Sequence, residues 1–138
     1  MDRSYTILYI DDDDDDLMIV TEAFEKYTDH LRVIHAYNGN EGLQVLRNMK
    51  EKNMLPCLII LDINMPVMDG KQTLAEIKRN KDYENIPVVM FSTSHSIYDK
   101  NFAERLGAEF ITKPASYLDI QGLVKEFVNK CQLEVLKD

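Results

Sequence analysis

The sequence predicts a doubly wound α/β fold, in which a parallel sheet of five strands lies between two layers of helices. Five short apolar runs alternate along the chain with five segments of helical periodicity. Strands that alternate with helices form βαβ units, whose crossovers are right-handed. Four of the apolar runs also end at an acidic, hydroxyl or lysine side chain. Such residues are expected at the ligand-binding edge of an open sheet, and we predict the strand order 2-1-3-4-5.

The apolar runs give the strands. We predict strands at residues 6–10, 32–36, 57–61, 87–91 and 109–112. Three of these runs are almost wholly apolar, which is typical of parallel strands covered on both faces. The second run contains Arg32 and His35 among apolar residues and alternates more, so it predicts an edge strand.

Apolar residues three and four positions apart give the helices. They are Leu17, Val20, Phe24 and Tyr27 in the first helix, Leu43 and Leu46 in the second, Leu74 and Ile77 in the third, and Ile120, Leu123, Val124, Phe127, Val128 and Cys131 in the fifth. The fourth helix is expected from about residue 97 to 106, and Gly107 can adopt the positive φ of a helix end. Asn38 and Glu41 have the spacing of a capping box at the start of the second helix.

Length and charge restrict the class of protein. A chain of 138 residues predicts a single domain over residues 1–138, with no second or output domain. A net charge of −8 argues against a nucleic-acid interface, which needs clustered basic residues. No apolar stretch is long enough for a membrane span, and residues 1–4 show no secretory signal. We therefore expect a cytoplasmic protein that binds neither nucleic acid nor membrane.

The two cysteines are expected to be buried apolar residues. Cys57 falls in an apolar strand and Cys131 on the apolar face of the last helix. Neither belongs to a CxxC pair or has a histidine nearby, so a metal site is not expected. In a reducing cytosol, a disulfide between them is also not expected. The histidines are scattered without ligand spacing, and we treat His30, His35 and His95 as incidental.

The chemistry is expected at the strand ends. Asp11 and Asp12 follow the first strand, Asp62 the third, Ser92 the fourth and Lys113 the fifth. The carboxyl ends of parallel strands lie along one edge of the sheet, so these side chains should converge on one crevice. Three carboxylates, a hydroxyl and an ammonium suit a divalent cation together with a phosphoryl group.

Asp62 is the expected nucleophile, because a carboxylate on a strand end is fixed in position and can form an aspartyl phosphate. Asp11 and Asp12 are expected to hold Mg²⁺, with Mn²⁺ as an alternative, aided by the Asn64 carbonyl. The next three acids, Asp14, Asp15 and Asp16, are expected to begin the first helix, where acids favour the helix dipole, rather than to bind metal.

Ser92 and Lys113 are expected to contact phosphoryl oxygens. Pro114 could position Lys113 through a cis peptide bond, although X–Pro bonds are usually trans. Phe110 is expected to be either a core aromatic residue or a ring that changes rotamer when Ser92 moves.

The residues Asp11-Asp12, Asp62, Asn64-Met65-Pro66, Met68-Asp69-Gly70, Ser92 and Lys113-Pro114, in this order and at these intervals, resemble the receiver domain of two-component response regulators. The resemblance runs from Thr6 to about Lys130 and implies a flavodoxin-like (βα)5 sandwich of the stand-alone, chemotaxis-regulator kind. It implies that Asp62 takes a phosphoryl group from the phosphohistidine of a sensor histidine kinase. It also implies that Asp62 joins Asp11, Asp12 and the Asn64 carbonyl in binding Mg²⁺. The surface of the fourth helix, fifth strand and fifth helix would then change as Ser92 draws in and Phe110 turns inward.

Two residues depart from the common pattern of that family. Ser92 replaces the more frequent threonine, which should keep the hydroxyl chemistry. Thr93 stands where the family usually has alanine or glycine, and its larger side chain is expected to restrict access to Asp62.

Alternatives remain open at this point. The phosphoryl group could pass on to a histidine phosphotransfer protein instead of switching an effector, or the domain could act without phosphorylation. A Mg²⁺-dependent phosphatase is disfavoured, because the haloacid-dehalogenase type needs an acid where this chain has Asn64. We therefore expect a signalling switch rather than an enzyme, with slow self-dephosphorylation. The sequence leaves open whether it is a monomer or a weak homodimer.

Overall fold

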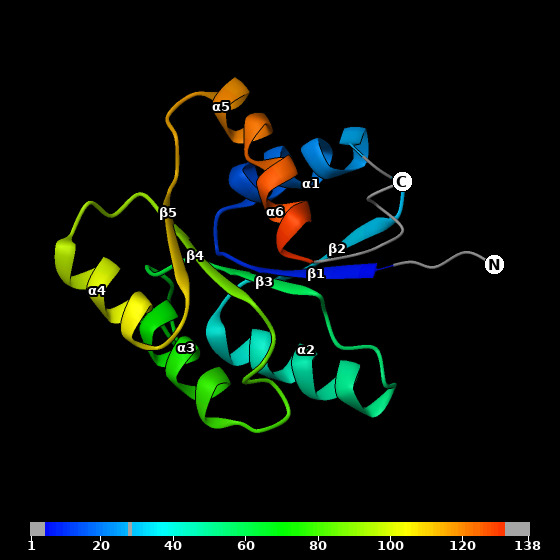
Figure 1. Ribbon diagram of the computed structural model, residues 1–138, viewed down its shortest axis with the longest axis vertical. Helices are drawn as coiled ribbons and strands as arrows, with labels where there is room; N and C mark the ends of the chain where they lie inside the picture. The colour runs from blue at the N-terminus through cyan, green and yellow to red at the C-terminus, as the bar shows by residue number, and fades with distance from the viewer. Residues whose placement is uncertain (1–4, 28, 132–138) are drawn as a thin grey trace.

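A parallel sheet of five strands forms the centre of the computed structural model, which describes residues 5–27 and 29–131 (Figure 1). The strands are β1 (Tyr5–Ile10), β2 (Leu31–Ala36), β3 (Leu58–Leu61), β4 (Val88–Ser92) and β5 (Glu109–Thr112). Their order is β2-β1-β3-β4-β5, and every neighbouring pair is parallel. The predicted order is confirmed, the strand bounds agree within one residue, and β2 is an edge strand as expected.

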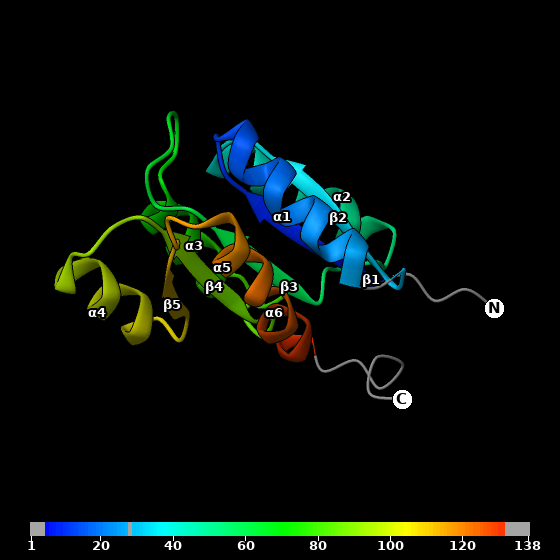
Figure 2. The same ribbon diagram turned by 90° about the horizontal axis from the view of Figure 1, so that it is seen from above.

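Helices cover both faces of the sheet. They are α1 (Asp14–Tyr27), α2 (Gly39–Glu51), α3 (Gly70–Arg79), α4 (Ile97–Arg105), α5 (Tyr117–Gly122) and α6 (Val124–Lys130). Helices α1, α5 and α6 lie together on one face, and α2, α3 and α4 lie on the other, with α4 beside β5 (Figures 1 and 2). Among the described residues, none of these helices has both the length and the apolar character needed to cross a lipid bilayer.

The alternation of side chains along the strands makes two separate cores. On β1, Ile7 and Tyr9 belong to the apolar cluster beneath α1 and α6, whereas Leu8 and Ile10 belong to the cluster above α2 and α3. All four side chains are almost completely buried. This two-sided burial explains why the central strands are continuously apolar in sequence.

The ends of the helices follow the expected local chemistry. The side chain of Asn38 accepts a hydrogen bond from the Glu41 amide at the start of α2, which confirms the predicted cap. The Glu41 carboxylate reaches back to the Tyr37 amide rather than to that of Asn38. After α4, Gly107 has φ of +82°, as its position predicts.

The predicted fifth helix is two short helices, contrary to expectation. The break falls at Leu123, whose amide donates to the Ile120 carbonyl in a tighter i to i+3 turn. Leu123 directly follows Gly122, which is a poor helix former because it loses the most backbone entropy. The apolar positions of α6 remain on the expected face, and Val124, Phe127 and Val128 are buried.

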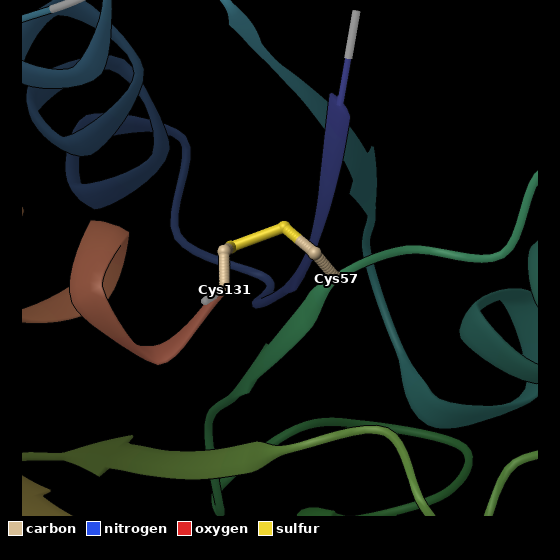
Figure 3. Close-up of a disulfide and its surroundings, with 2 residues drawn as sticks. All are labelled: Cys57 and Cys131. Atoms are coloured by element: carbon tan, nitrogen blue, oxygen red, sulfur yellow. A yellow bond between two sulfur atoms is a disulfide. The ribbon is translucent and has the colours of Figure 1, made fainter. Parts of the chain in front are cut away.

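The two cysteines are bonded to each other, so the expectation of two free thiols is wrong. Cys57, just before β3, and Cys131, just after α6, form a disulfide across a separation of 74 residues (Figure 3). Their Cα atoms are 4.8 Å apart, within the usual range for disulfides. Cys131 is buried in the cluster beneath α1, as expected, and Cys57 packs against that cluster. The spacing of the two cysteines in the sequence does not predict this pairing. It arises because the fold brings the end of α6 to the start of β3.

Candidate functional site

The carboxyl edge of the sheet gathers the polar residues that follow the strands. Asp11 comes directly after β1, Asp62 after β3 and Lys113 after β5, and Ser92 is the last residue of β4. The parallel register places the ends of neighbouring strands side by side. The predicted convergence of these side chains is confirmed by the contacts among them.

Three carboxylates form the centre of the site. One oxygen each from Asp11, Asp12 and Asp62 lies within 4.8 Å of the others. Asp11 is fully buried and Asp62 is 8% exposed, whereas Asp12 faces solvent. Because Asp12 faces solvent while the other two carboxylates are fixed, a cation can approach the cluster from water.

Lys113 provides the positive charge among these acids. Its Nζ lies 2.7 Å from Asp11 Oδ2, 2.8 Å from Asp16 Oδ2 and 3.8 Å from Asp62 Oδ2. Its side chain is only 6% exposed. Burial would lower the pKa of Lys113, but the hydrogen bonds that its ammonium donates to Asp11 and Asp16 outweigh burial, and its pKa is raised. The lysine is therefore a permanent cation.

Asp16 lies in the first turn of α1 with Asp14 and Asp15, as expected, and it also contacts the site, which the sequence did not indicate. Asp13 caps α1, and its Oδ1 accepts from the amides of Asp15 and Asp16. Asp16 is half-buried, and its carboxylate reaches Lys113. The six consecutive aspartates gave no signal to separate it from its exposed neighbours, Asp14 and Asp15.

Two further residues hold Asp11 and were not singled out from the sequence. The Tyr9 hydroxyl donates to Asp11 Oδ2 over 2.9 Å within the core. His35 Nε2 lies 2.9 Å from the Asp11 carbonyl oxygen, so this histidine is not incidental. Burial first, and then the charge of Asp11, raise the pKa of the Tyr9 phenol, so the group stays a neutral donor. A tyrosine in an apolar strand two residues before an acid was the available signal.

The backbone around Asp62 is tightly packed. The Ile63 amide donates to Asp62 Oδ1 over 2.9 Å, which fixes the carboxylate. The start of α3 approaches closely, and a Cβ on Gly70 would lie 2.1 Å from the Asp62 carbonyl oxygen. Only glycine fits there, which explains the Asp69-Gly70 pair: Asp69 caps α3 and Gly70 lets the helix reach the strand end.

The pKa of Asp62 is raised from 3.8 to about 6. Burial is the main cause, the Lys113 charge opposes it, and the Asp11 charge adds to it. At neutral pH the group is therefore mostly the carboxylate, although its ionised form is less favourable than in water.

Ser92 joins the site to the loop before α4. Its side chain is buried, its hydroxyl oxygen accepts from the Ser94 amide over 3.3 Å, and its carbonyl accepts from the Lys113 amide over 2.8 Å. The Ser94 hydroxyl in turn donates to Asp99 over 2.5 Å, and Asp99 pairs with Lys71 of α3. The loop after Ser92 is thus held between two helices.

The other predicted site residues lie farther out. Asn64 and Thr93 are exposed on the loops that follow β3 and β4. Phe110 is half-buried and packs against the apolar cluster on the face of α2, α3 and α4. The peptide bond before Pro114 is trans, so a cis bond does not position Lys113.

The residues present fit a hard divalent cation. Asp11, Asp12, Asp16 and Asp62 bring four carboxylates against one ammonium. Crowded like charges are costly unless a cation neutralises them, and carboxylate oxygens are the ligands that Mg²⁺ and Mn²⁺ prefer. A carboxylate that is neutralised on one side can also accept an electrophile on the other.

Comparisons with known proteins agree with this geometry. The family model of the response regulator receiver domain matches residues 7–125. Response regulator Rcp1 of Synechocystis sp. is 33% identical over 86% of this chain and 83% of its own length. Protein PilH of Pseudomonas aeruginosa is 30% identical over 86% of this chain and 91% of its own.

Solved structures of response regulators are also similar to this chain. The phosphorylated cyanobacterial phytochrome response regulator RcpA superposes with a TM-score of 0.83 at 32% identity, covering 89% of this chain and 90% of that one. The Mn²⁺-bound form of Rcp1 superposes with a TM-score of 0.79 at 30% identity, covering 94% of this chain and 95% of that one.

Proposed function

Since this chain belongs to the response regulator receiver domain family, we propose that it is a signalling switch that accepts a phosphoryl group on Asp62. The observation that carries the proposal is the convergence of Asp62 with Asp11, Asp12 and Lys113 at one edge of the sheet. In this role the protein changes state and passes a signal, and it is not an enzyme with a substrate of its own. The phosphorylated RcpA structure supports the same chemistry in a relative.

Asp62 is suited to nucleophilic attack. Its carboxylate is mostly ionised at neutral pH and held on one oxygen by the Ile63 amide, and 11% of its side chain is exposed. One oxygen forms a bond to phosphorus while the bond from phosphorus to the donor breaks. With a sensor kinase as donor, the leaving group is a histidine imidazole, which takes up a proton.

We assign the metal ligands to Asp11, Asp12, Asp62 and the Asn64 carbonyl. The first three are supported by the proximity of their carboxylate oxygens. When bound, Mg²⁺ neutralises the charge that repels an anionic donor. Mg²⁺ is the proposed cation and Mn²⁺ the alternative, since a Mn²⁺-bound form of Rcp1 exists.

Lys113 and Ser92 are proposed to bind the phosphoryl oxygens. Lys113 Nζ lies 3.8 Å from Asp62 and is already surrounded by carboxylates. A phosphoryl group on Asp62 can therefore replace one of the carboxylates that the ammonium now contacts. The Ser92 hydroxyl accepts from the Ser94 amide and donates toward the Asp62 carboxylate, whose pKa this contact lowers, so it lies within reach of a phosphoryl oxygen on Asp62. Thr93, exposed next to Ser92, is proposed to restrict entry to the site.

The response is proposed to travel from Ser92 to the surface of α4, β5 and α5. Moving Ser92 disturbs the Ser94 to Asp99 contact and so the start of α4. Phe110 on β5 is half-buried and is proposed to turn inward as that loop moves. The proposed partners are a sensor histidine kinase and an effector protein. The protein is proposed to act as a monomer or weak homodimer. Its proposed location is the cytoplasm, where ATP is available to the kinase.

A phosphorelay step is the alternative output. In that case the phosphoryl group leaves Asp62 for a histidine phosphotransfer protein. Mixing phosphorylated protein with candidate phosphotransfer domains distinguishes the two, because transfer of the label to a histidine supports a relay and retention on Asp62 supports a switch.

The test is intact mass after incubation with acetyl phosphate and Mg²⁺. We expect one phosphoryl group on the wild-type chain, lost when EDTA removes the metal, and none on Asp62→Asn. Asp82→Asn is the matched control, because Asp82 is a surface residue paired with Lys50. Beryllofluoride binding, followed by NMR, covers the case of rapid hydrolysis. An adduct that survives in Asp62→Asn would contradict the assignment.

A further inference from the structure

The Cys57–Cys131 disulfide lies at the edge of the sheet opposite the acid cluster. Cys57 precedes the first residue of β3, whereas Asp62 follows the last. The bond fixes the end of α6 to the amino end of a central strand (Figure 3). Nothing in the proposed phosphoryl chemistry uses these two sulfur atoms.

Helix α6 also carries packing that reaches toward the site. The Phe127 ring lies 5.5 Å from that of Phe91 on β4 and 6.1 Å from that of Phe24 on α1. Phe91 directly precedes Ser92, and the Lys113 ammonium lies 5.8 Å from its ring centroid. A bond that holds α6 therefore also holds the apolar layer beneath Ser92 and Lys113.

A disulfide is unusual for a protein that works with a kinase. Thiol reductants keep most cysteines of the cytosol reduced, and the disulfides that do form there are usually transient and redox-sensing. This part of the argument rests on the proposed function, which places the protein where ATP is available. A disulfide in such a compartment is therefore expected to open and close.

We propose that Cys57 and Cys131 form a reversible redox site, which exchanges with small thiols and disulfides of the glutathione class and, when oxidised, fixes α6 to the sheet. Cys57 is the more exposed of the two residues and is the point of attack. The site is distinct from the phosphoryl-accepting edge and gives the domain a second input.

The exchange balances as two thiol–disulfide steps. A glutathione thiolate attacks the Cys57 sulfur, the bond between the two cysteines breaks, and Cys131 leaves as a thiolate. A second glutathione thiolate attacks the glutathione sulfur of the mixed disulfide, and Cys57 leaves as a thiolate. Both thiolates take protons from water. Two glutathione thiols have then been oxidised to one glutathione disulfide, and the protein disulfide has gained two electrons.

The first measurement is the oxidised fraction of the full chain in mixtures of reduced and oxidised glutathione. After equilibration the sample is quenched with acid, free thiols are alkylated, and intact mass gives the fraction. We expect a smooth curve across the series that is the same whether the protein starts oxidised or reduced. A bond that persists in the most reducing mixture, or never forms in the most oxidising one, overturns the proposal.

The second measurement is hydrogen exchange of the two redox forms by mass spectrometry. On reduction, peptides covering α6 and β4 should exchange at least roughly tenfold faster. A peptide from α2, on the other face of the sheet, should not change. Equal exchange of α6 in both forms would show that the bond does not fix this helix.

The chain has only two cysteines, which makes the controls simple. Replacing both Cys57 and Cys131, once by serine and once by alanine, should give proteins that show the exchange of the reduced form in every redox mixture, and the two kinds of substitution guard against a folding defect in one. Asp62→Asn should give the same redox curve as the wild type. A failure of phosphorylation therefore leaves the redox result intact, and the reverse also holds.

Discussion

The ammonium of Lys113 lies 2.7 Å from the carboxylate of Asp11, although the two residues are 102 positions apart. Asp11 follows β1 and Lys113 follows β5, and strands β3 and β4 lie between them. The lysine side chain therefore crosses the carboxyl edge of the sheet. The same ammonium also contacts Asp16 and lies near Asp62, so it is the internal counter-ion of the acid cluster.

Replacing Lys113 by Met should destabilise the metal-free protein at pH 7 by about 3 kcal/mol, because it leaves buried carboxylates without a counter-ion. Urea denaturation in EDTA measures the loss. Adding Mg²⁺ should recover more stability in this variant than in the wild type, because the cation takes over the neutralising role.

Lys50→Met is the matched control for that experiment. Lys50 pairs with Asp82 on the surface, and both side chains are almost half exposed. Its loss should cost less than about 1 kcal/mol, with no special response to Mg²⁺. Similar losses for the two lysines would mean that Lys113 is not the counter-ion of the cluster.

The raised pKa of Asp62 predicts that Asp62→Asn stabilises the metal-free protein at pH 7. The folded pKa of about 6 lies above the ordinary value of 3.8, so the folded state binds the proton more tightly than the unfolded state. Stability contributed by this group is present below pH 3.8 and is lost as pH rises to about 6. Asparagine removes that loss, which amounts to at most about 3 kcal/mol.

Thermal denaturation of wild type and Asp62→Asn, at a series of pH values in EDTA, measures this effect. The two melting temperatures should converge near pH 4 and separate above pH 6. A difference that stays constant over the whole pH range would show that charge is not its cause.

The hydrogen bond from Tyr9 to Asp11 predicts a role in positioning the metal ligand. Tyr9→Phe removes the hydroxyl that donates to a fully buried carboxylate, which should cost about 1–3 kcal/mol of stability. Mg²⁺ should also bind more weakly, because Asp11 loses one of the contacts that orient it. Tyr98→Phe is the control, since Tyr98 is 79% exposed and should be neutral. Unchanged Mg²⁺ affinity in Tyr9→Phe would leave Tyr9 with a purely structural role.

The acidic run should divide into metal ligands and helix acids. Asp12→Ala should weaken Mg²⁺ binding by at least about tenfold, because it removes one oxygen of the cluster. Asp15 is exposed in the first turn of α1, so Asp15→Ala should cost only a few tenths of a kcal/mol through the helix dipole. Isothermal titration with Mg²⁺ compares them, and equal affinities would contradict the division.

Val67 shows backbone strain in the loop that follows Asp62. It has φ of +69°, which a β-branched residue rarely adopts, and its side chain is 81% exposed. Val67→Gly should raise the free energy of unfolding by about 1 kcal/mol through relief of this strain. Val67→Ala keeps a Cβ and should recover less. A glycine variant that is less stable than the alanine variant would show that the loop favours a side chain there.

The sequence by itself determined the fold and most of the site. Continuous apolar runs fixed the central strands, because a parallel strand covered on both faces can expose neither side. The acids, hydroxyl and lysine at the strand ends then shared one edge, because parallel strands end together. The sequence alone could therefore assign five residues to this edge of the sheet: Asp11, Asp12, Asp62, Ser92 and Lys113.

Only the tertiary structure decided how distant side chains pair. Asp16 contacts Lys113 because the first turn of α1 directs its side chain toward the sheet edge. A uniform run of aspartates does not indicate which of them takes this position. Tyr9 reached Asp11 because the strand buries both side chains together. Cys57 forms a disulfide with Cys131 because α6 ends beside the start of β3. Local sequence sets strands, helices and their ends, whereas contacts between residues far apart depend on the exact packing of the elements that carry them.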